Sequence, residues 1–127
     1  MILGIGVDLM DKTRLCEAFL VKGDPFYELT FALEEQHAAD HNLNRLEYLA
    51  GRFAAKEAIC KSLGLGQAQK RVALHEICVL NDADGAPYVR LTGALQQHAE
   101  QRGIGTILVS LSYDGNFVTA FALAQSK

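Results

Sequence analysis

One segment that combines a mostly apolar surface with several charges constrains this chain most. It runs from Gly51 to Gly66 and reads GRFAAKEAICKSLGLG. Because it is rich in alanine, lacks proline and carries Gly64 where a helix would stop, we expect its middle to be helical. A helix that is apolar over most of its circumference is usually buried, and buried charges need partners. The charges that need partners here are Arg52, Lys56, Glu57 and Lys61.

Two interpretations of these charges are open from the helix alone. In the first, the helix lies at the surface, and Glu57 and Lys61 form an ordinary ion pair between residues four apart, worth a few tenths of a kcal/mol. In the second, the helix is buried and its charges belong to a functional site. The rest of the chain has to decide between these structural and functional roles.

Length and composition indicate a single domain, residues 1–127. Half of the residues are hydrophobic and the formal net charge is −3, which favours a substantial core and argues against nucleic-acid binding. The longest apolar runs are too short to cross a bilayer, so no membrane association is expected. The N-terminus lacks the basic start and apolar core of a signal peptide, and we therefore expect a cytoplasmic protein.

Cysteines and histidines do not indicate a metal site. Cys16, Cys60 and Cys78 are odd in number and lack paired spacing, so we interpret them as free thiols. His37 and His41 are four residues apart, a spacing that could hold a metal on a helix, but no third ligand is evident. We interpret both histidines as solvated side chains.

The first ten residues indicate a buried strand. Gly4 and Gly6 interrupt its apolar residues, which suggests close backbone approach by a neighbour or a ligand. Asp8 is the only charged residue within this strand. It is either a cap or turn residue, a role for which Asp11 competes, or a ligand.

The remaining segments predict an α+β fold with a mainly antiparallel sheet and helices on one side. Turn signals at Asp84-Gly85 and at 114–116 indicate two hairpins, and Thr92 is a plausible helix cap. Further strands are expected over residues 72–80, 88–91, 106–112 and 117–124; helices over 12–22, around 33–35 and over 92–103; and a loop over 64–71.

Two motifs together resemble those of the holo-[acyl-carrier-protein] synthases, the small trimeric class of 4'-phosphopantetheinyl transferases. The first is GIGVD, which ends at Asp8, and the second is GRFAAKEA, which starts at Gly51 and is followed by Lys61. Residues 84–88 look like the family's central hairpin, and residues 109–112 and 121–124 look like its last two strands. The resemblance therefore covers essentially the whole chain.

This resemblance implies an enzyme that moves the 4'-phosphopantetheine group of coenzyme A onto a serine of an acyl carrier protein and releases adenosine 3',5'-bisphosphate. It assigns Mg²⁺ binding to Asp8 and Glu57, which suits a hard cation that usually takes one or two carboxylates and keeps several waters. Lys61 would lie against the phosphates as a cation. The base that accepts the serine proton stays open between Glu57 and a metal-bound water.

Further roles come from the same resemblance. Arg52 matches a family position that contacts a coenzyme A phosphate across a subunit boundary, and Gly64 and Gly66 would leave backbone room beside the nucleotide. A homotrimer with active sites at the subunit interfaces is implied. The charges on the buried helix would then be partnered by the metal and the phosphates.

Three positions depart from the family pattern. Tyr113 stands where many relatives have histidine, Leu29 at a usual arginine and Ala32 at a usual threonine. The segment 12–22, by which relatives bind an acidic carrier protein, mixes acidic with basic residues, so its electrostatic steering is weaker. We hypothesise a narrowed carrier-protein preference. Two alternatives to an enzyme remain: a relative that binds coenzyme A or a carrier protein without turnover, and a structural trimer in which Glu57 pairs with Lys61.

Overall fold

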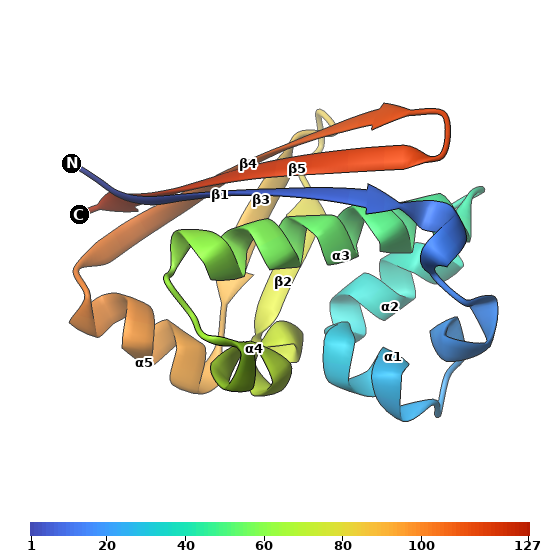
Figure 1. The fold of residues 1–127 in the computed structure, drawn as a ribbon, viewed down its shortest axis with the longest axis horizontal. Coiled ribbons are helices and arrows are strands. Elements are labelled where there is room, and N and C mark those ends of the chain that lie inside the picture. The colour runs from blue at the N-terminus through green and yellow to red at the C-terminus, as the bar shows by residue number, and fades with distance from the viewer.

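A three-stranded antiparallel sheet with a long helix along one face forms the frame of the molecule (Figure 1). The computed structural model describes residues 1–127, except for the side chain of Val72. The sheet has the order β1-β5-β4, with strands β1 Ile2–Asp11, β4 Ile104–Asp114 and β5 Phe117–Ser126. Helix α3, Arg45–Ser62, covers the inner face of this sheet. The expected α+β class with antiparallel sheets is confirmed.

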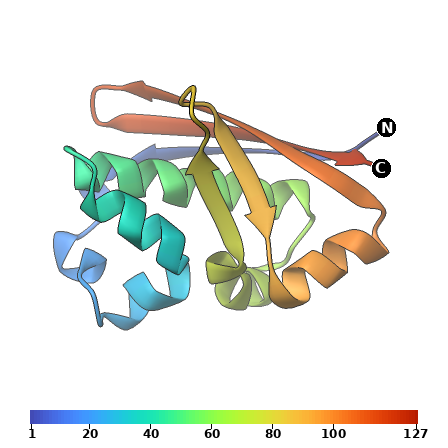
Figure 2. The same cartoon turned by 180° about the vertical axis from the view of Figure 1, so that it is seen from behind.

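A second, two-stranded sheet packs on another side of α3, next to the first sheet. Strands β2, Ile77–Asn81, and β3, Pro87–Leu91, form the hairpin expected around Asp84-Gly85, and β3 also contacts β4. Figure 2 shows this hairpin between helices. Helices α1, Pro25–Thr30, and α2, Leu33–Asp40, lie on one side of it, and helix α5, Gly93–Gln101, lies on the other. Helix α4, Gln67–Ala73, lies at the end of the hairpin where β2 begins.

Strand β1 lies directly against α3 because two of its residues have no side chain. A Cβ atom at Gly4 would lie 2.0 Å from the Ser62 carbonyl oxygen, and one at Gly6 would lie 2.0 Å from the Ala58 carbonyl oxygen. The close approach expected at these glycines is confirmed, and the neighbour is α3. Successive residues on this face of β1 meet earlier turns of α3, so the strand and the helix run in opposite directions.

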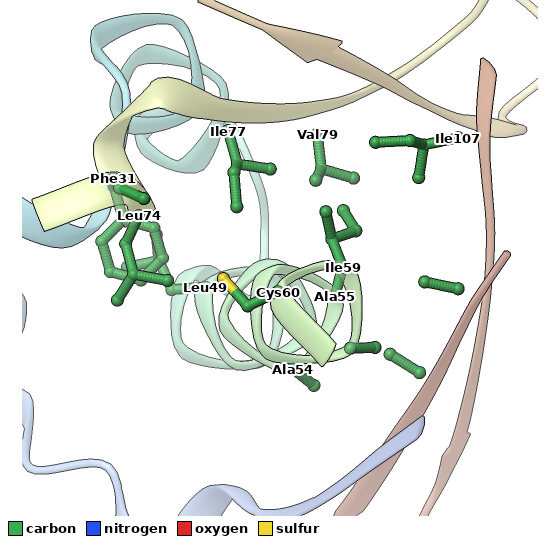
Figure 3. Packing of buried hydrophobic residues seen from close by; sticks show 14 of the residues in the cluster. Phe31, Leu49, Ala54, Ala55, Ile59, Cys60, Leu74, Ile77, Val79 and Ile107 are labelled. Carbon is green, nitrogen blue, oxygen red and sulfur yellow. The ribbon is translucent and has the colours of Figure 1, made fainter. Parts of the chain in front are cut away.

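The core lies on both sides of α3, which is buried as its sequence predicted. Helix α3 and strand β5 contact each other, and both contribute buried alanines to the core cluster, while α3 also contacts β2 of the second sheet. Figure 3 shows Ile59 of α3 directed toward Val79 of β2 and Ile107 of β4. The helix begins where Asn44 accepts a hydrogen bond from the Glu47 N–H, and it ends before Gly64, whose φ is +70°.

The helix expected over residues 12–22 is absent, and this prediction was wrong. Two short 3₁₀ turns, Lys12–Arg14 and Glu17–Leu20, take its place, separated by extended backbone at Leu15 and Cys16. Asp11 caps the first turn by accepting from the Thr13 N–H. Of the side chains expected to point inward, Leu15 and Leu20 are buried, whereas Cys16 and Phe19 are exposed. Burial of two leucines against the core therefore outweighs the helical periodicity.

Residues 64–80 also differ from the expectation of a loop followed by a strand. They form helix α4 and a 3₁₀ turn, Leu74–Glu76, and strand β2 begins only at Ile77. The Gln69 side chain accepts a hydrogen bond from the Gly66 N–H and so caps α4, and the residues that follow favour helix. Thr92 makes no side-chain cap for α5. The Glu76 carboxylate accepts from Ala94 and Leu95 there instead.

All three cysteines are free thiols, as expected. His37 and His41 are both exposed on or just after α2, in agreement with their interpretation as solvated side chains. No helix among the described residues is long and apolar enough to span a membrane.

Candidate active site

Strand β1 brings Asp8 to the face of α3. Asp8 follows Gly6 by two residues and therefore lies on the same face of the strand, about one helical turn nearer the N-terminus of α3. From α3, Lys61 reaches across to β1: its Nζ donates to the Val7 carbonyl oxygen at 2.8 Å and lies 3.5 Å from the Asp8 Oδ1. The close packing at Gly6 thus places a carboxylate of the strand beside a cation of the helix.

Glu57 pairs with a residue that the sequence did not single out. Its Oε2 lies 2.9 Å from the Nζ of Lys70, which projects from α4, and both side chains are largely buried. Among the described residues, Glu57 and Lys61 form no ion pair with each other, although they are four apart on one helix. The interpretation of these two residues as an ordinary surface pair therefore does not hold.

The two carboxylates act on each other electrostatically. Burial raises the pKa of Asp8 above its usual value, the positive charge of Lys61 opposes this, and the negative charge of Glu57 raises the pKa further. Glu57 therefore lies near enough to Asp8 for its negative charge to disfavour the ionised form of Asp8. A cation between them would relieve this repulsion.

The chemistry of these side chains fits a magnesium ion. Both donors are carboxylate oxygens, which hard Mg²⁺ prefers, and no cluster of three or more His, Cys, Asp or Glu side chains exists among the described residues. Two carboxylates without a third ligand would leave coordination positions for water and for phosphate oxygens. Asp8 and Glu57 thus suit an ion that is shared with a substrate, rather than an ion enclosed by protein.

Arg52 is buried, with only 3% of its surface exposed. Among the described residues, it forms no ion pair with a carboxylate. Its guanidinium donates to the Val79 carbonyl oxygen at 3.3 Å and to the Asn81 Oδ1 at 3.1 Å, and it stacks 4.4 Å from the centre of the Tyr48 ring. The Nε of Arg52 has no partner. This side chain lines a cavity of about 240 Å³ together with Tyr113. A buried cation beside a cavity is a natural site for an anion.

Gly64 and Gly66 lie in the turn between α3 and α4. A Cβ atom at Gly64 would lie 3.1 Å from the Nη1 of Arg102, which also donates to the Leu63 carbonyl oxygen. The nearest atom to a Cβ at Gly66 is the Gln69 Oε1, at 3.9 Å. The room beside Gly64 is therefore filled by an arginine that the sequence did not point to, while the space beside Gly66 is open.

Lys56 has a structural partner and stands apart from Asp8 and Glu57. Its Nζ lies 2.5 Å from the Glu35 Oε1, both side chains are fully buried, and it also donates to the carbonyl oxygens of Leu74 and Ile77. Glu35 in turn accepts from the backbone N–H groups of Ala32 and Val79. The expectation that metal and phosphates partner the charges of α3 is wrong for Lys56, because α2 supplies a carboxylate that no local pattern indicates.

Comparison with known proteins agrees with the fold and with these side chains. A sequence model of the 4'-phosphopantetheinyl transferase superfamily matches residues 4–122. The chain is 35% identical over 125 residues to a holo-[acyl-carrier-protein] synthase of Geobacter metallireducens, covering 98% of both chains. It is 39% identical over 124 residues to that of Desulforudis audaxviator, covering 98% of this chain and 93% of the relative.

Solved structures give the same result. The structure of holo-[acyl-carrier-protein] synthase from Neisseria meningitidis superposes with a TM-score of 0.86 at 32% identity, covering 99% of this chain and 100% of the other. A synthase–CoA complex from Chronobacterium ammoniagenes superposes with a TM-score of 0.80 at 31% identity, covering 98% and 97%. Fold and sequence together define an enzyme of the phosphopantetheinyl transferase class. The chain belongs to the holo-[acyl-carrier-protein] synthase family.

Proposed function

We propose that this chain transfers the 4'-phosphopantetheine group of coenzyme A to a serine of an acyl carrier protein and releases adenosine 3',5'-bisphosphate, with Mg²⁺ bound by Asp8 and Glu57. The observation that carries this proposal is the meeting of Asp8 and Lys61 across the β1–α3 contact, with Glu57 close enough to act on Asp8. The names of the relatives point to a carrier protein as acceptor, and the CoA complex of one of them points to coenzyme A as donor.

The reaction breaks one phosphoanhydride bond and forms one phosphate ester. The serine hydroxyl of the carrier protein attacks the phosphorus that bears the pantetheine group, and the bond from that phosphorus to the bridging oxygen breaks. The electron pair and the bridging oxygen leave with adenosine 3',5'-bisphosphate, and the serine proton passes to a base, which would be either Glu57 or a water that the metal would hold. Bound Mg²⁺ would neutralise negative charge on the diphosphate oxygens.

Lys61 would contribute a fixed positive charge to this step. Its contacts with the Val7 carbonyl oxygen and with Asp8 hold the ammonium group at the junction of β1 and α3. A cation that is already positioned there needs little reorganisation when charge develops on the leaving phosphate. We therefore propose that Lys61 binds the phosphates of coenzyme A.

Arg52, Gly64 and Gly66 would complete the nucleotide site. The unpartnered Nε of Arg52 and the adjoining cavity favour an anionic group of coenzyme A there. Tyr113 lines the same cavity, so its replacement of the histidine found in many relatives would change how the anion is bound. The open space beside Gly66 suits close approach of a ligand to the backbone, whereas Arg102 takes the room beside Gly64.

A homotrimer is part of the proposal, and the outer face of the sheet supports it. Large apolar side chains are exposed there on all three strands. We call this set the outer apolar patch: Ile5, Val7 and Leu9 of β1, Leu108 of β4 and Phe121 of β5. A contiguous exposed apolar surface of this kind usually marks a protein interface. Copies of the same chain would cover it.

The deciding experiment is to incubate an apo acyl carrier protein with the purified protein, coenzyme A and Mg²⁺. We expect the mass of the carrier protein to rise by one phosphopantetheine group. The variants Asp8→Ala and Glu57→Ala should each lower the rate by about 10²-fold or more while the circular dichroism stays unchanged. Glu100→Ala, which removes an exposed carboxylate of α5, serves as the matched control and should keep full activity.

Two outcomes would contradict the proposal. Binding of coenzyme A without any mass change on several carrier proteins would indicate a non-catalytic relative. Full activity of the Asp8 and Glu57 variants would remove these carboxylates from the reaction.

A separate comparison tests the hypothesis of a narrowed carrier-protein preference. Equal rates on a housekeeping carrier protein and on specialised ones would end that hypothesis.

A further inference from the structure

Helix α4 brings a second lysine to the two carboxylates. The Nζ of Lys70 lies 2.9 Å from the Glu57 Oε2, with the lysine side chain 22% and the glutamate side chain 13% exposed. The positive charge of Lys70 also acts on Asp8, where it counters the rise in pKa that burial causes. Lys70 therefore belongs to the same electrostatic group as Asp8, Glu57 and Lys61.

This group of four side chains is formally neutral. Asp8 and Glu57 carry two negative charges, and Lys61 and Lys70 carry two positive ones. The two lysines differ in their contacts. Lys61 also donates to the Val7 backbone, whereas Lys70 forms an ion pair with Glu57 and with no other described residue. Lys70 is thus the cation that a metal ion on Glu57 would displace.

We propose that Lys70 is a second phosphate-binding cation, which neutralises Glu57 in the free protein and moves to the diphosphate of coenzyme A when a divalent cation takes its place. This inference rests on the proposed function and names a further residue of the same site. A divalent cation adds two positive charges to a neutral group, and a diphosphate can balance them. Lys70 therefore stays in the site after it leaves Glu57.

The position of Lys70 suits this exchange. Helix α4 lies below the C-terminal half of α3 and is joined to it by the turn at Gly64–Gly66 (Figure 1). Glu57 and Lys61 both project from that part of α3. Because a lysine stem has several rotatable bonds and the ammonium group keeps some solvent exposure, its partner can change without a movement of the helix.

The test uses two ligands whose affinities should change in opposite directions. Mn²⁺, which also prefers oxygen ligands, is titrated into the protein without coenzyme A and followed by electron paramagnetic resonance. Coenzyme A is titrated in saturating Mg²⁺ and followed by calorimetry. In Lys70→Met, Mn²⁺ should bind about two- to fivefold more tightly, because its competitor is gone. Coenzyme A should bind about tenfold more weakly, because a charged contact to phosphate is lost.

Matched variants separate this role from a structural one. Arg71→Gln removes an exposed positive charge from the next position of α4 and should change neither affinity. Lys70→Arg should restore most of the coenzyme A affinity. Lys70→Gln repeats the measurement if the methionine variant folds poorly, as judged by circular dichroism.

Each result has a definite meaning. Unchanged or weaker Mn²⁺ binding in Lys70→Met, or unchanged coenzyme A affinity, would overturn the role of Lys70 while the proposed function stands. A wild-type protein that binds neither Mn²⁺ nor coenzyme A would overturn both. Tighter Mn²⁺ binding together with weaker coenzyme A binding would support the exchange, since a loss of folding cannot raise one affinity and lower the other.

Discussion

At the residue scale, α3 contributes one residue to each of three lysine–carboxylate pairs, and the three pairs lie in different environments. Lys61 approaches Asp8 at an exposed strand edge, Lys70 covers Glu57 under partial burial, and Lys56 is enclosed with Glu35. Burial raises the pKa of Glu35 and lowers that of Lys56, and each partner's charge opposes the shift. The same chemical pair is therefore fully buried in one place and open to solvent in another, and only the more open pairs are part of the proposed site.

Breaking the enclosed pair should destabilise the whole domain. Lys56→Met leaves the Glu35 carboxylate buried without a counter-charge, so we expect a loss of about 3–5 kcal/mol in the free energy of unfolding. Chemical denaturation measures this quantity. The double variant Glu35→Gln with Lys56→Met should lose less than the sum of the two single variants. Additive losses would show that the two side chains do not interact.

Removing the charge of Asp8 should have the opposite effect on stability. The pKa of Asp8 is raised in the folded protein, so its ionised form is disfavoured there at neutral pH. Asp8→Asn should therefore raise the melting temperature of the metal-free protein by a few degrees at pH 7 while transfer activity is lost.

The sign of this effect sets its pH dependence. Because the pKa of Asp8 is higher in the folded than in the unfolded state, protonation of Asp8 stabilises the folded state. This stabilisation is fully present below the unfolded-state pKa and is lost as the pH rises through the folded-state pKa. The stability difference between wild type and Asp8→Asn should accordingly disappear at low pH, where Asp8 is protonated in both states. Melting curves in the presence of EDTA over an acid-to-neutral series provide the measurement. A less stable variant at pH 7 would contradict the argument.

At the element scale, the contact between β1 and α3 positions the candidate site. Gly4 and Gly6 allow the backbone of the strand to touch the backbone of the helix, and Asp8 is the next residue on that face. The helix supplies Glu57 and Lys61 one turn apart. Small residues in the strand thus determine how far Asp8 and Glu57, the proposed metal ligands, lie from each other.

A methyl group at Gly6 should separate these two elements. In Gly6→Ala the new Cβ would lie 2.0 Å from the Ala58 carbonyl oxygen, so backbone must shift. We expect a loss of about 1–3 kcal/mol in stability and a larger relative loss of transfer activity. Gly66→Ala is the control for stability alone, because a Cβ there meets only Gln69 at 3.9 Å and should cost less than about 1 kcal/mol. Equal losses of stability in the two variants would show that the β1–α3 spacing is not critical.

At the scale of the whole molecule, the outer apolar patch consists of large side chains that stay exposed within one chain. The sheet packs one face on α3 (Figure 1). The residues of the patch are exposed and belong to the other face. Phe121 alone is 45% exposed. Assembly of several copies would bury this patch and bring the sites of neighbouring subunits together.

A charge in the patch should prevent this assembly. Phe121→Lys places an ammonium group at the proposed trimer interface, where it would be desolvated without a partner, so we expect monomers by sedimentation velocity. Its fold should persist, since Phe121 points away from α3. Gln101→Lys, on the exposed surface of α5, should remain a trimer. A trimeric Phe121→Lys variant, or a monomeric wild type, would remove the outer apolar patch as the interface.

Much of this protein follows from its sequence alone. The helical segment around Gly51, the glycines of the first strand and the two hairpin turns are local signals, and each corresponds to an observed element. The family, too, is readable from the motifs that end at Asp8 and surround Glu57. Local patterns suffice here because backbone propensity, glycine and turn geometry depend on neighbouring residues.

The tertiary structure alone decided which charge meets which. Three contacts join residues that are far apart in sequence, and no sequence periodicity predicts them. They are Lys70 with Glu57, Glu35 with Lys56, and Arg102 with Gly64. It also replaced the expected helix over 12–22 with two short turns. In each case the outcome depends on distances through space and on burial against the core, which exist only once the chain has folded.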